Sequence, residues 1–234
     1  IIFINFILLK IQKSTSCTTV TYADDTSLLF RVAPRSAQAD THDALAAVER
    51  IIDIFHGFGL RVNADKTSIT LFRTARRTVE AVPLILQGTP VRLDDTPRCL
   101  GLVLNENLKW KPHVTSLAPK CYAVISCIRR LREVGIPLEG LLAAYKALFI
   151  PVLSYAITVW GGAYANVSHR MQIIQNDALR AIFRRRRQQS VADLYQRHSL
   201  LRFDQLYILR LAQLAYKTTR QLIPEEIAFP IVPN

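Results

Sequence analysis

The chain has 234 residues, of which half are hydrophobic, with a mean hydropathy of +0.16 and a formal net charge of +12. This composition supports one or two folded domains and excludes a disordered chain. Residues 1–108 carry 12 basic and 11 acidic side chains, residues 109–222 carry 18 and 5, and residues 223–234 carry none and 2. The basic excess in the second half is typical of a region that lies on a polyanion, with a merely solvated basic surface as the alternative.

The four cysteines form no closely spaced pair, and no histidine lies at zinc-ligand spacing from them. The sequence therefore indicates neither a disulfide framework nor a zinc site, and an intracellular, reducing compartment is expected, with nucleus or cytoplasm left open. Residues 1–11 are apolar but interrupted by Asn5 and Lys10, and they fall short of the about 20 residues that span a bilayer. No membrane partner is expected. Because the chain does not begin with methionine, we expect a fragment.

Two short β-prone runs, residues 17–22 and 27–32, lie on either side of Asp24 and Asp25. They predict a hairpin with the acidic pair at its tip. A single aspartate is common in turns, but two adjacent carboxylates repel one another unless a cation lies between them. Mg²⁺ prefers oxygen ligands and is usually held by one or two carboxylates together with substrate phosphates. The pair is a candidate metal site.

The run Tyr22-Ala23-Asp24-Asp25 resembles the YxDD box of reverse transcriptases, and its continuation into residues 26–29 is similar to the form in non-LTR (LINE-type, jockey-like) retrotransposon polymerases. The resemblance implies an RNA-directed DNA polymerase, whose partners are an RNA template, a DNA primer and a dNTP. It also implies two Mg²⁺ ions about 4 Å apart, with Asp24 as the principal ligand and Asp25 as the helper.

Apolar residues at helical spacing from Leu45 to Phe55 predict an amphipathic helix that begins at an Asp40 N-cap and ends at Gly57 and Gly59. This helix is expected to cover one face of a sheet.

The run after it, Gly59-Leu60 with Asn63, Lys66 and Thr67, is similar to the segment that follows the YxDD box in the same family. The resemblance implies that Lys66 neutralises or protonates the departing pyrophosphate. A solvated loop lysine is the alternative.

Strands are predicted over residues 82–86 and 91–93, joined by a turn, and over residues 98–104. The run around Leu100 and Gly101, with Trp110 and His113 behind it, resembles the family's "LG(V/L).LD..L.W..H" segment. The resemblance implies the hairpin that grips the primer strand and makes Leu100 and Gly101 candidate nucleic-acid contacts, because glycine lets a backbone approach closely. A simple bulge at Gly101 is the alternative, and His113 is expected at a helix start rather than as a ligand.

From residue 114 onward the periodicity is helical, and Gly161-Gly162 is a clear break. Helices are predicted over residues 117–131, 138–149, 152–160 (opened by Pro151), 171–182 and 203–222. Residues 148–160 are similar to the segment that follows the polymerase in this family.

A run of four arginines follows the fourth of these helices: Arg184, Arg185, Arg186 and Arg187. Arginine binds phosphate bidentately, so the run is the leading candidate for a nucleic-acid contact. A nuclear-localisation-like run and a solvated helix end are the alternatives.

The fold expected is α+β. Residues 1–108 would form the C-terminal part of a polymerase palm, with an antiparallel sheet that contains the acidic hairpin and the primer-grip-like hairpin. Residues 109–222 would form a basic α-helical thumb-like region, and residues 223–234 a tail.

Two-metal polymerases take a third carboxylate from an earlier strand, and residues 1–23 contain no acid. The chain by itself is therefore expected to be inactive. A non-catalytic nucleic-acid-binding relic of a mobile element is the alternative, and a helical interaction domain without a nucleic-acid role is a third possibility.

Overall fold

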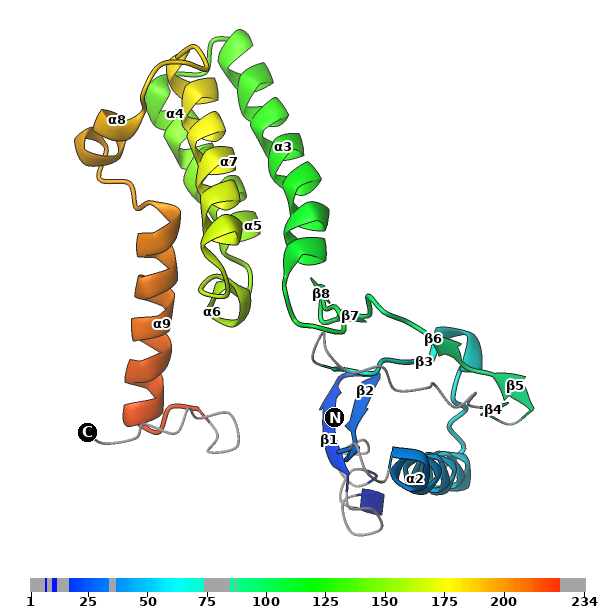
Figure 1. Cartoon of the computed structure of the whole chain (residues 1–234). Coiled ribbons are helices and arrows are strands. Elements are labelled where there is room, and N and C mark those ends of the chain that lie inside the picture. Colours follow the sequence, from blue (N-terminus) through cyan, green and yellow to red (C-terminus); the bar gives the residue numbers. More distant parts are fainter. Residues whose placement is uncertain are drawn as a thin grey trace. The chain divides into compact units, whose positions relative to one another are not determined.

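The computed structural model separates into two compact units, Ile1–Pro97 and Arg98–Asn234. Both units combine helices with short strand pairs, as the expected α+β class requires (Figure 1). The β7–β8 hairpin lies in the second unit, together with the helices. The structure describes residues 7, 10–11, 17–33, 37–73, 85–86 and 88–223.

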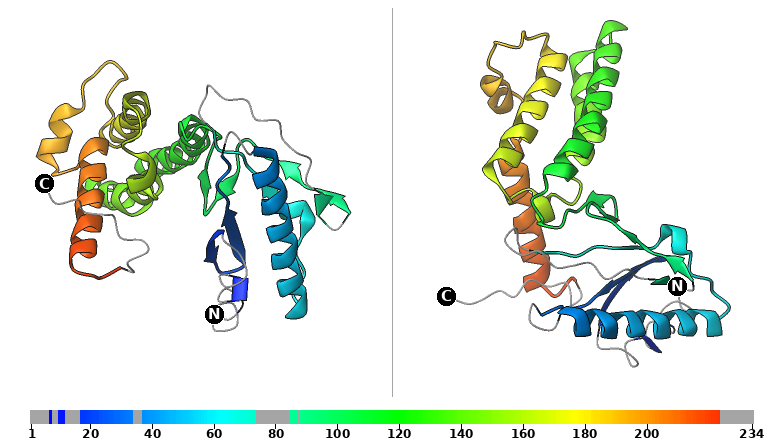
Figure 2. Two further views of the ribbon diagram at one scale, coloured as in Figure 1. Left: turned by 60° about the horizontal axis from the view of Figure 1, so that its bottom comes forward. Right: turned by 45° about the vertical axis from the view of Figure 1, so that its right-hand side comes forward.

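The first unit begins with the predicted hairpin. Strands β1 (Thr18–Tyr22) and β2 (Asp25–Leu29) pair antiparallel, with Tyr22 opposite Asp25. Because side chains alternate along a strand, one face carries Leu28, which packs against the helix that follows, α2 (Ala37–Gly57). The views in Figure 2 show the hairpin beside this helix.

Helix α2 starts three residues earlier than predicted. The Asp40 carboxylate accepts a hydrogen bond from the backbone N–H of Ala33 at 2.7 Å, so Asp40 lies in the first turn and ties down the incoming chain. The predicted N-cap was therefore wrong. The other end is confirmed: Gly59, at φ 74°, and Leu60 donate to the carbonyls of His56 and Phe55 at 2.8 and 2.9 Å. This pattern closes a helix with a left-handed glycine.

Two adjacent isoleucines of α2 enter different apolar clusters. Ile51 packs with Ile7 and Ile11 and with the hairpin. Ile52 packs with Val62, Ile69 and Val91, from the segments that follow the helix. The helix thus joins the hairpin to the short strands, although each cluster has few fully buried side chains.

The short strands pair differently from the prediction. Residues 85–86 (β4, Ile85–Leu86) form a hairpin with β5 (Thr89–Pro90), whereas β6 (Arg92–Leu93) pairs in parallel with β3 (Ser68–Ile69). The predicted partner of residues 91–93 was therefore wrong, and residues 82–84 lie outside the described residues. The strands described form four separate pairs, so the single antiparallel sheet that was expected is not seen among them.

The second unit opens with a hairpin where one β run was predicted. Leu100 and Gly101, at φ 46° and 80°, turn the chain between its two strands, so the predicted β run over residues 98–104 is divided into a hairpin, the arrangement that the resemblance implied. The elements of this unit are β7 (Arg98–Cys99), β8 (Leu102–Val103), α3 (Lys111–Glu133), α4 (Leu138–Ala144), the π-helical η2 (Tyr145–Phe149), α5 (Ile150–Ser154), α6 (Ile157–Trp160), α7 (Ala165–Phe183), α8 (Ala192–Arg197) and α9 (Phe203–Thr219).

The predicted helices are present, with shifted ends. Pro151 lies in the first turn of α5, as expected of a residue that opens a helix, and α5 follows the π-helical η2 directly. The chain breaks at Tyr155 and Ala156, where Ala156 has φ 48°. Helix α3 is longer than predicted and keeps Pro119 inside it. The break at Gly161-Gly162 is confirmed, because α6 ends at Trp160.

One continuous apolar core holds the second unit together. Helices α3 and α7 pack along each other and contribute half of its buried side chains (Figure 1). Trp160, Phe149 and Leu153 are fully buried. The buried Gln175 on α7 donates from its Nε2 to the Tyr145 hydroxyl at 2.9 Å, which gives both of these groups a hydrogen-bond partner inside the core. None of the helices in the described part of the chain is both long and apolar enough to cross a membrane.

Candidate catalytic hairpin and arginine loop

The acidic pair lies at the hairpin tip, as predicted. Ala23 and Asp24 form the two-residue turn, and Asp25 is the first residue of β2. Both carboxylates are exposed, and their residues are adjacent in the chain. The tip therefore offers two carboxylate groups that neither the core nor the strand ladder uses.

The turn contains a strained residue. Ala23 has φ 54°, a left-handed conformation that glycine or asparagine adopts more readily. Such residues typically cost about 1–3 kcal/mol and cluster at functional sites, where the surroundings hold them in place. Alanine at this position favours a functional hairpin over a turn selected only for its stability.

The donor set at the tip fits a hard divalent cation in its chemistry. Carboxylate oxygens suit Mg²⁺, which keeps several waters and needs only one or two protein carboxylates when substrate phosphates complete its shell. Within the described residues no group of three or more His, Cys, Asp or Glu side chains could hold a metal ion. Asp24 and Asp25 alone would thus be an open site that substrate completes.

Lys66 is exposed on a separate element of the first unit. It ends the short 3₁₀ helix η1 (Ala64–Lys66), which the Asn63 side chain caps by accepting from the Lys66 N–H at 3.3 Å. The Thr67 hydroxyl donates to the Asn63 carbonyl at 2.8 Å. Asn63 and Thr67 thus have structural roles in this run, whereas the Lys66 ammonium projects from a turn that they fix.

Leu100 and Gly101 form the β7–β8 turn. Both have positive φ, which matches a type I′ hairpin turn. A Cβ on Gly101 would lie 3.5 Å from the Tyr155 ring. Gly101 is therefore a turn residue rather than the bulge considered as the alternative, and its exposed backbone carries no side chain of its own.

The four arginines do not form one continuous helix end. Helix α7 ends at Phe183, and Arg184 is its C-cap in the left-handed region, at φ 55°. The segment from residue 184 to residue 190, which we call the arginine loop, then leads to α8. Arg184, Arg186 and Arg187 are exposed, but Arg185 is not fully so.

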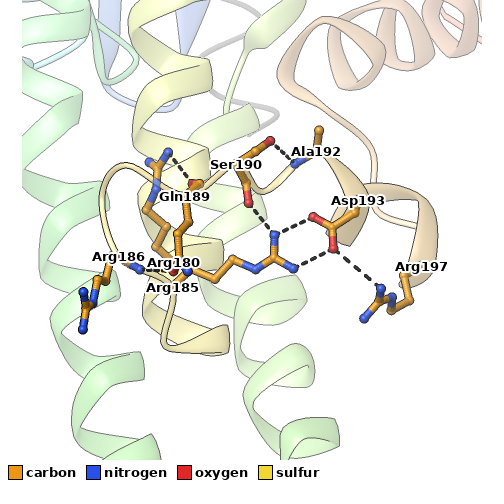
Figure 3. Close-up of polar contacts among 8 residues, drawn as sticks. All are labelled: Arg180, Arg185, Arg186, Gln189, Ser190, Ala192, Asp193 and Arg197. Atoms are coloured by element: carbon orange, nitrogen blue, oxygen red, sulfur yellow. Dashed lines mark hydrogen bonds and ion pairs between the residues drawn. The ribbon is translucent and has the colours of Figure 1, made fainter.

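Arg185 is occupied within the protein (Figure 3). Its Nη1 and Nη2 donate to the two carboxylate oxygens of Asp193 at 2.5 and 2.6 Å, and Nη1 also donates to the Ser190 carbonyl. Arg197 approaches the same carboxylate at 3.7 Å. The Arg185 guanidinium holds the pKa of Asp193 below its ordinary value, mainly through these hydrogen bonds.

The other side of the arginine loop faces solvent. In Figure 3 the Arg186 side chain points away from the Arg185–Asp193 pair. The Arg186 backbone N–H donates to the Gln189 Oε1 at 2.7 Å, which closes the loop locally. The sequence-based set of four contacts therefore divides into Arg185, which ties the loop to α8, and three outward arginines.

Two groups of important residues escaped sequence reasoning. Asp193 gave no signal, because an Arg–Asp pair eight residues apart across a loop has no fixed spacing. Tyr155 and Trp160 did lie in a run that resembled the family, residues 148–160, but no contact could be assigned to them. Spatial proximity, rather than residue type, identifies both groups.

The chain is similar in sequence to known proteins. It is 30% identical over 169 residues to the probable RNA-directed DNA polymerase from transposon BS of Drosophila melanogaster, which covers 69% of this chain and 18% of that protein. It is 27% identical over 171 residues to the RNA-directed DNA polymerase from mobile element jockey of the same species, with the same coverage.

A third relative is the retrovirus-related Pol polyprotein from type-1 retrotransposable element R1 of Bradysia coprophila, 26% identical over 147 residues, which are 60% of this chain and 14% of that protein. The chain thus spans less than a fifth of the length of these relatives. No family model and no solved structure matches it. By sequence, the chain is a homologue of the RNA-directed DNA polymerases of non-LTR retrotransposons, jockey among them.

Proposed function

We propose that the chain forms part of an RNA-directed DNA polymerase that uses an RNA template and a DNA primer. The observation that supports this most is the Tyr22-Ala23-Asp24-Asp25 hairpin, which presents two exposed carboxylates on a turn with a strained alanine. Relatives named as RNA-directed DNA polymerases support the same reaction. The first unit would act as part of a palm, and the second as a thumb-like region.

In this proposal Asp24 and Asp25 hold Mg²⁺, which when bound activates the primer 3′-hydroxyl and stabilises charge on the leaving pyrophosphate. Asp24, in the turn, would be the principal ligand, and Asp25 the helper. Lys66 would place a cation beside the pyrophosphate and donate a proton to it. The Asn63 cap and the Thr67 hydrogen bond would keep the lysine on a fixed turn.

The arginine loop would bind the phosphates of the RNA–DNA duplex. Arg184, Arg186 and Arg187 are its exposed members, while Arg185 ties the loop to α8 through Asp193. Phosphate contacts position a duplex without reading its sequence. This division of labour is consistent with a polymerase, which must bind every sequence.

Metal binding at the hairpin can be tested without activity. Mn²⁺ added to the 234-residue chain should broaden the NMR amide signals of residues 23–26 before others. Asp24→Asn and Asp25→Asn should remove this local broadening, because each deletes a carboxylate of the site. Asp53→Asn, an exposed aspartate on α2, is the matched control. Broadening that survives both hairpin variants would contradict the metal site.

Duplex binding is a separate test. The affinity for an RNA–DNA duplex should fall linearly with the logarithm of salt concentration. The double variant Arg186→Ala/Arg187→Ala should reduce the slope by about 2, because about one counterion is released per phosphate contact. Arg50→Ala/Arg61→Ala, which removes two exposed arginines of the first unit, should leave the slope nearly unchanged. Equal slopes in both double variants would show that the arginine loop does not contact the phosphates of the duplex.

The second candidate function is that of a non-catalytic, nucleic-acid-binding relic of a mobile element. The concentration of basic charge in residues 109–222 favours this candidate. A relic binds duplex as above but shows no local Mn²⁺ effect at residues 23–26. Because residues 1–23 contain no acid, we expect these 234 residues alone to extend no primer. Primer extension that Asp24→Ala abolishes would overturn that expectation, and absence of any salt-dependent binding would favour a helical interaction domain.

A further inference from the structure

Two separate runs of the sequence, residues 100–113 and 148–160, meet in one contact network in the second unit. The Val103 N–H donates to the His113 Nδ1 at 3.3 Å, and the His113 ring lies 5.1 Å from the Trp160 ring, edge to face. The Trp160 Nε1–H donates to the Tyr155 carbonyl at 2.9 Å. The Tyr155 hydroxyl donates to the Leu100 carbonyl at 2.7 Å. The contacts thus form a closed circuit from the β7–β8 hairpin through His113, Trp160 and Tyr155 back to the same hairpin. We call this set of contacts the Trp160 network.

The network runs from the core to the surface. Trp160 is fully buried and His113 is 3% exposed, whereas Tyr155 is 53% exposed and Leu100 is 43% exposed. Nδ1 of His113 accepts the Val103 hydrogen bond, and burial, with a further contribution from Lys120, lowers the pKa of His113, which favours the neutral ring that this bond requires. A rigid buried end is thus connected to an exposed turn.

Three residues around the network are strained. Leu100, Trp110 and Ala156 have φ of 46°, 59° and 48°, although none is glycine. A type I′ turn prefers Asn-Gly, so leucine in its first central position is unfavourable locally. Residues in such conformations persist only where surrounding contacts over-determine them. The turn at Leu100-Gly101 is therefore held by the Trp160 network rather than by its own sequence.

The surface at this turn suits a nucleic-acid backbone. Gly101 leaves main chain uncovered, and Arg98, Lys109 and Lys111 are exposed on the segments that flank the hairpin. Basic side chains beside accessible backbone N–H groups match the phosphates and sugars of a strand. The turn can contact a strand closely only if its orientation is fixed.

We propose that Tyr155, His113 and Trp160 are positioning residues that hold the Leu100-Gly101 turn in one orientation for the 3′ end of a nucleic-acid strand. This inference rests on the polymerase role proposed above. Tyr155 is the member that can be altered with least damage to the core, because its ring is half exposed and its hydroxyl donates to the Leu100 carbonyl.

The first measurement is amide hydrogen exchange in the 234-residue chain. Tyr155→Phe deletes one hydroxyl and should speed exchange at Val103 by about fivefold, the usual effect of one lost hydrogen bond, while the amides of α7 stay unchanged. Tyr164→Phe is the matched control, because the structure records no hydrogen bond from the half-exposed Tyr164 hydroxyl to a described residue. Unchanged exchange at Val103 would overturn the positioning role.

The second measurement compares two RNA–DNA hybrids of equal length, one blunt and one with a recessed DNA 3′ end. The wild-type chain should prefer the recessed end, and Tyr155→Phe should lose about fivefold of this preference while keeping its affinity for the blunt hybrid. Leu100→Asn, which tolerates the left-handed conformation, should restore the preference when combined with Tyr155→Phe.

The outcomes separate this inference from the proposed function. A wild-type chain that binds both hybrids equally, or a Tyr155→Phe variant that keeps the full preference, would overturn the inference and leave duplex binding intact. A wild-type chain that binds neither hybrid would overturn the proposed function, and with it the strand-end role, whatever hydrogen exchange shows at Val103.

Discussion

The two compact units support their exposed functional residues in different ways. In Ile1–Pro97 the acidic pair lies on a hairpin whose buried support is a small cluster around Ile51. In Arg98–Asn234 the β7–β8 turn and the arginine loop are connected by specific hydrogen bonds to one continuous core. Functional residues that are similarly exposed can therefore be held in place by very different amounts of buried structure. This difference predicts that mutations of equal size will have unequal effects in the two units.

Replacement of Trp160 tests the comparison most severely. Trp160 is fully buried, so Trp160→Ala removes a large core side chain and should cost about 3–5 kcal/mol of unfolding free energy. In the first unit, Tyr22→Ala alters an aromatic that is 66% exposed and should change stability by no more than about 0.5 kcal/mol. Urea unfolding followed by circular dichroism measures both. Similar costs would show that the hairpin is buried more deeply than the structure indicates.

Replacing a glycine by alanine adds a single methyl group and compares how tightly the two units are packed. A Cβ on Gly161 would lie 2.6 Å from the Ile157 carbonyl oxygen and 2.9 Å from the Tyr207 ring. Gly161→Ala should therefore cost about 1–3 kcal/mol, as overpacked cores do.

The control for this variant lies in the first unit. A Cβ on Gly57, the last residue of α2, meets nothing within 4 Å. Gly57→Ala should be neutral or stabilise by up to about 1 kcal/mol, because alanine favours a helix. Thermal unfolding distinguishes the two variants. A Gly161→Ala protein as stable as wild type would show that the Ile157 turn of α6 and the Tyr207 ring can both shift to admit the methyl group.

Local patterns predicted the elements that local physics determines. The β-prone runs of residues 17–22 and 27–32 on either side of the acidic pair were sufficient for the hairpin, and Gly57 and Gly59 for the end of α2. The basic, helical character of the second half likewise followed from its composition and periodicity.

Long-range pairing could not be predicted in this way. The parallel pairing of β3 with β6 and the Arg185–Asp193 pair depend on how distant segments meet. Asp40 was assigned to an N-cap because its residue type suits one, but its carboxylate binds the Ala33 N–H instead. The site was recognisable because its two carboxylates are adjacent in sequence, whereas the Trp160 network joins residues 55 positions apart.

Lowering the pH should change the unfolding free energy of the second unit by a smaller amount, because His113 is buried there. Its pKa is lowered in the folded protein, so the unfolded chain binds the proton more readily. The contribution of His113 to stability is therefore complete above about pH 6.5 and is lost as the pH falls from there through the lowered folded pKa.

Urea unfolding between pH 7.5 and about pH 4.5 measures this slope, since that range brackets the ordinary pKa of histidine. His113→Asn keeps an acceptor near Nδ1 and should flatten the slope. His169→Asn, an exposed histidine on α7, should leave it unchanged. An unchanged slope in His113→Asn would mean that other groups set the acid sensitivity of the second unit.

The smallest effect on stability is expected at the Arg185–Asp193 pair, because it lies at the surface, but its effect on loop order should be clear. Asp193→Asn removes the bidentate pair with Arg185, so the amides of residues 186–189 should show lower NMR order parameters. Asp204→Asn is the control: it breaks the exposed contact with Arg202 and should leave these order parameters unchanged. The pKa of Asp193 is lowered by Arg185, so this order should survive at the ordinary pKa of aspartate, about 3.9, and disappear only as the pH falls through the lowered value. Order that persists in Asp193→Asn would mean that the backbone hydrogen bonds of the loop suffice, and the second unit would then support its arginines as lightly as the first supports its aspartates.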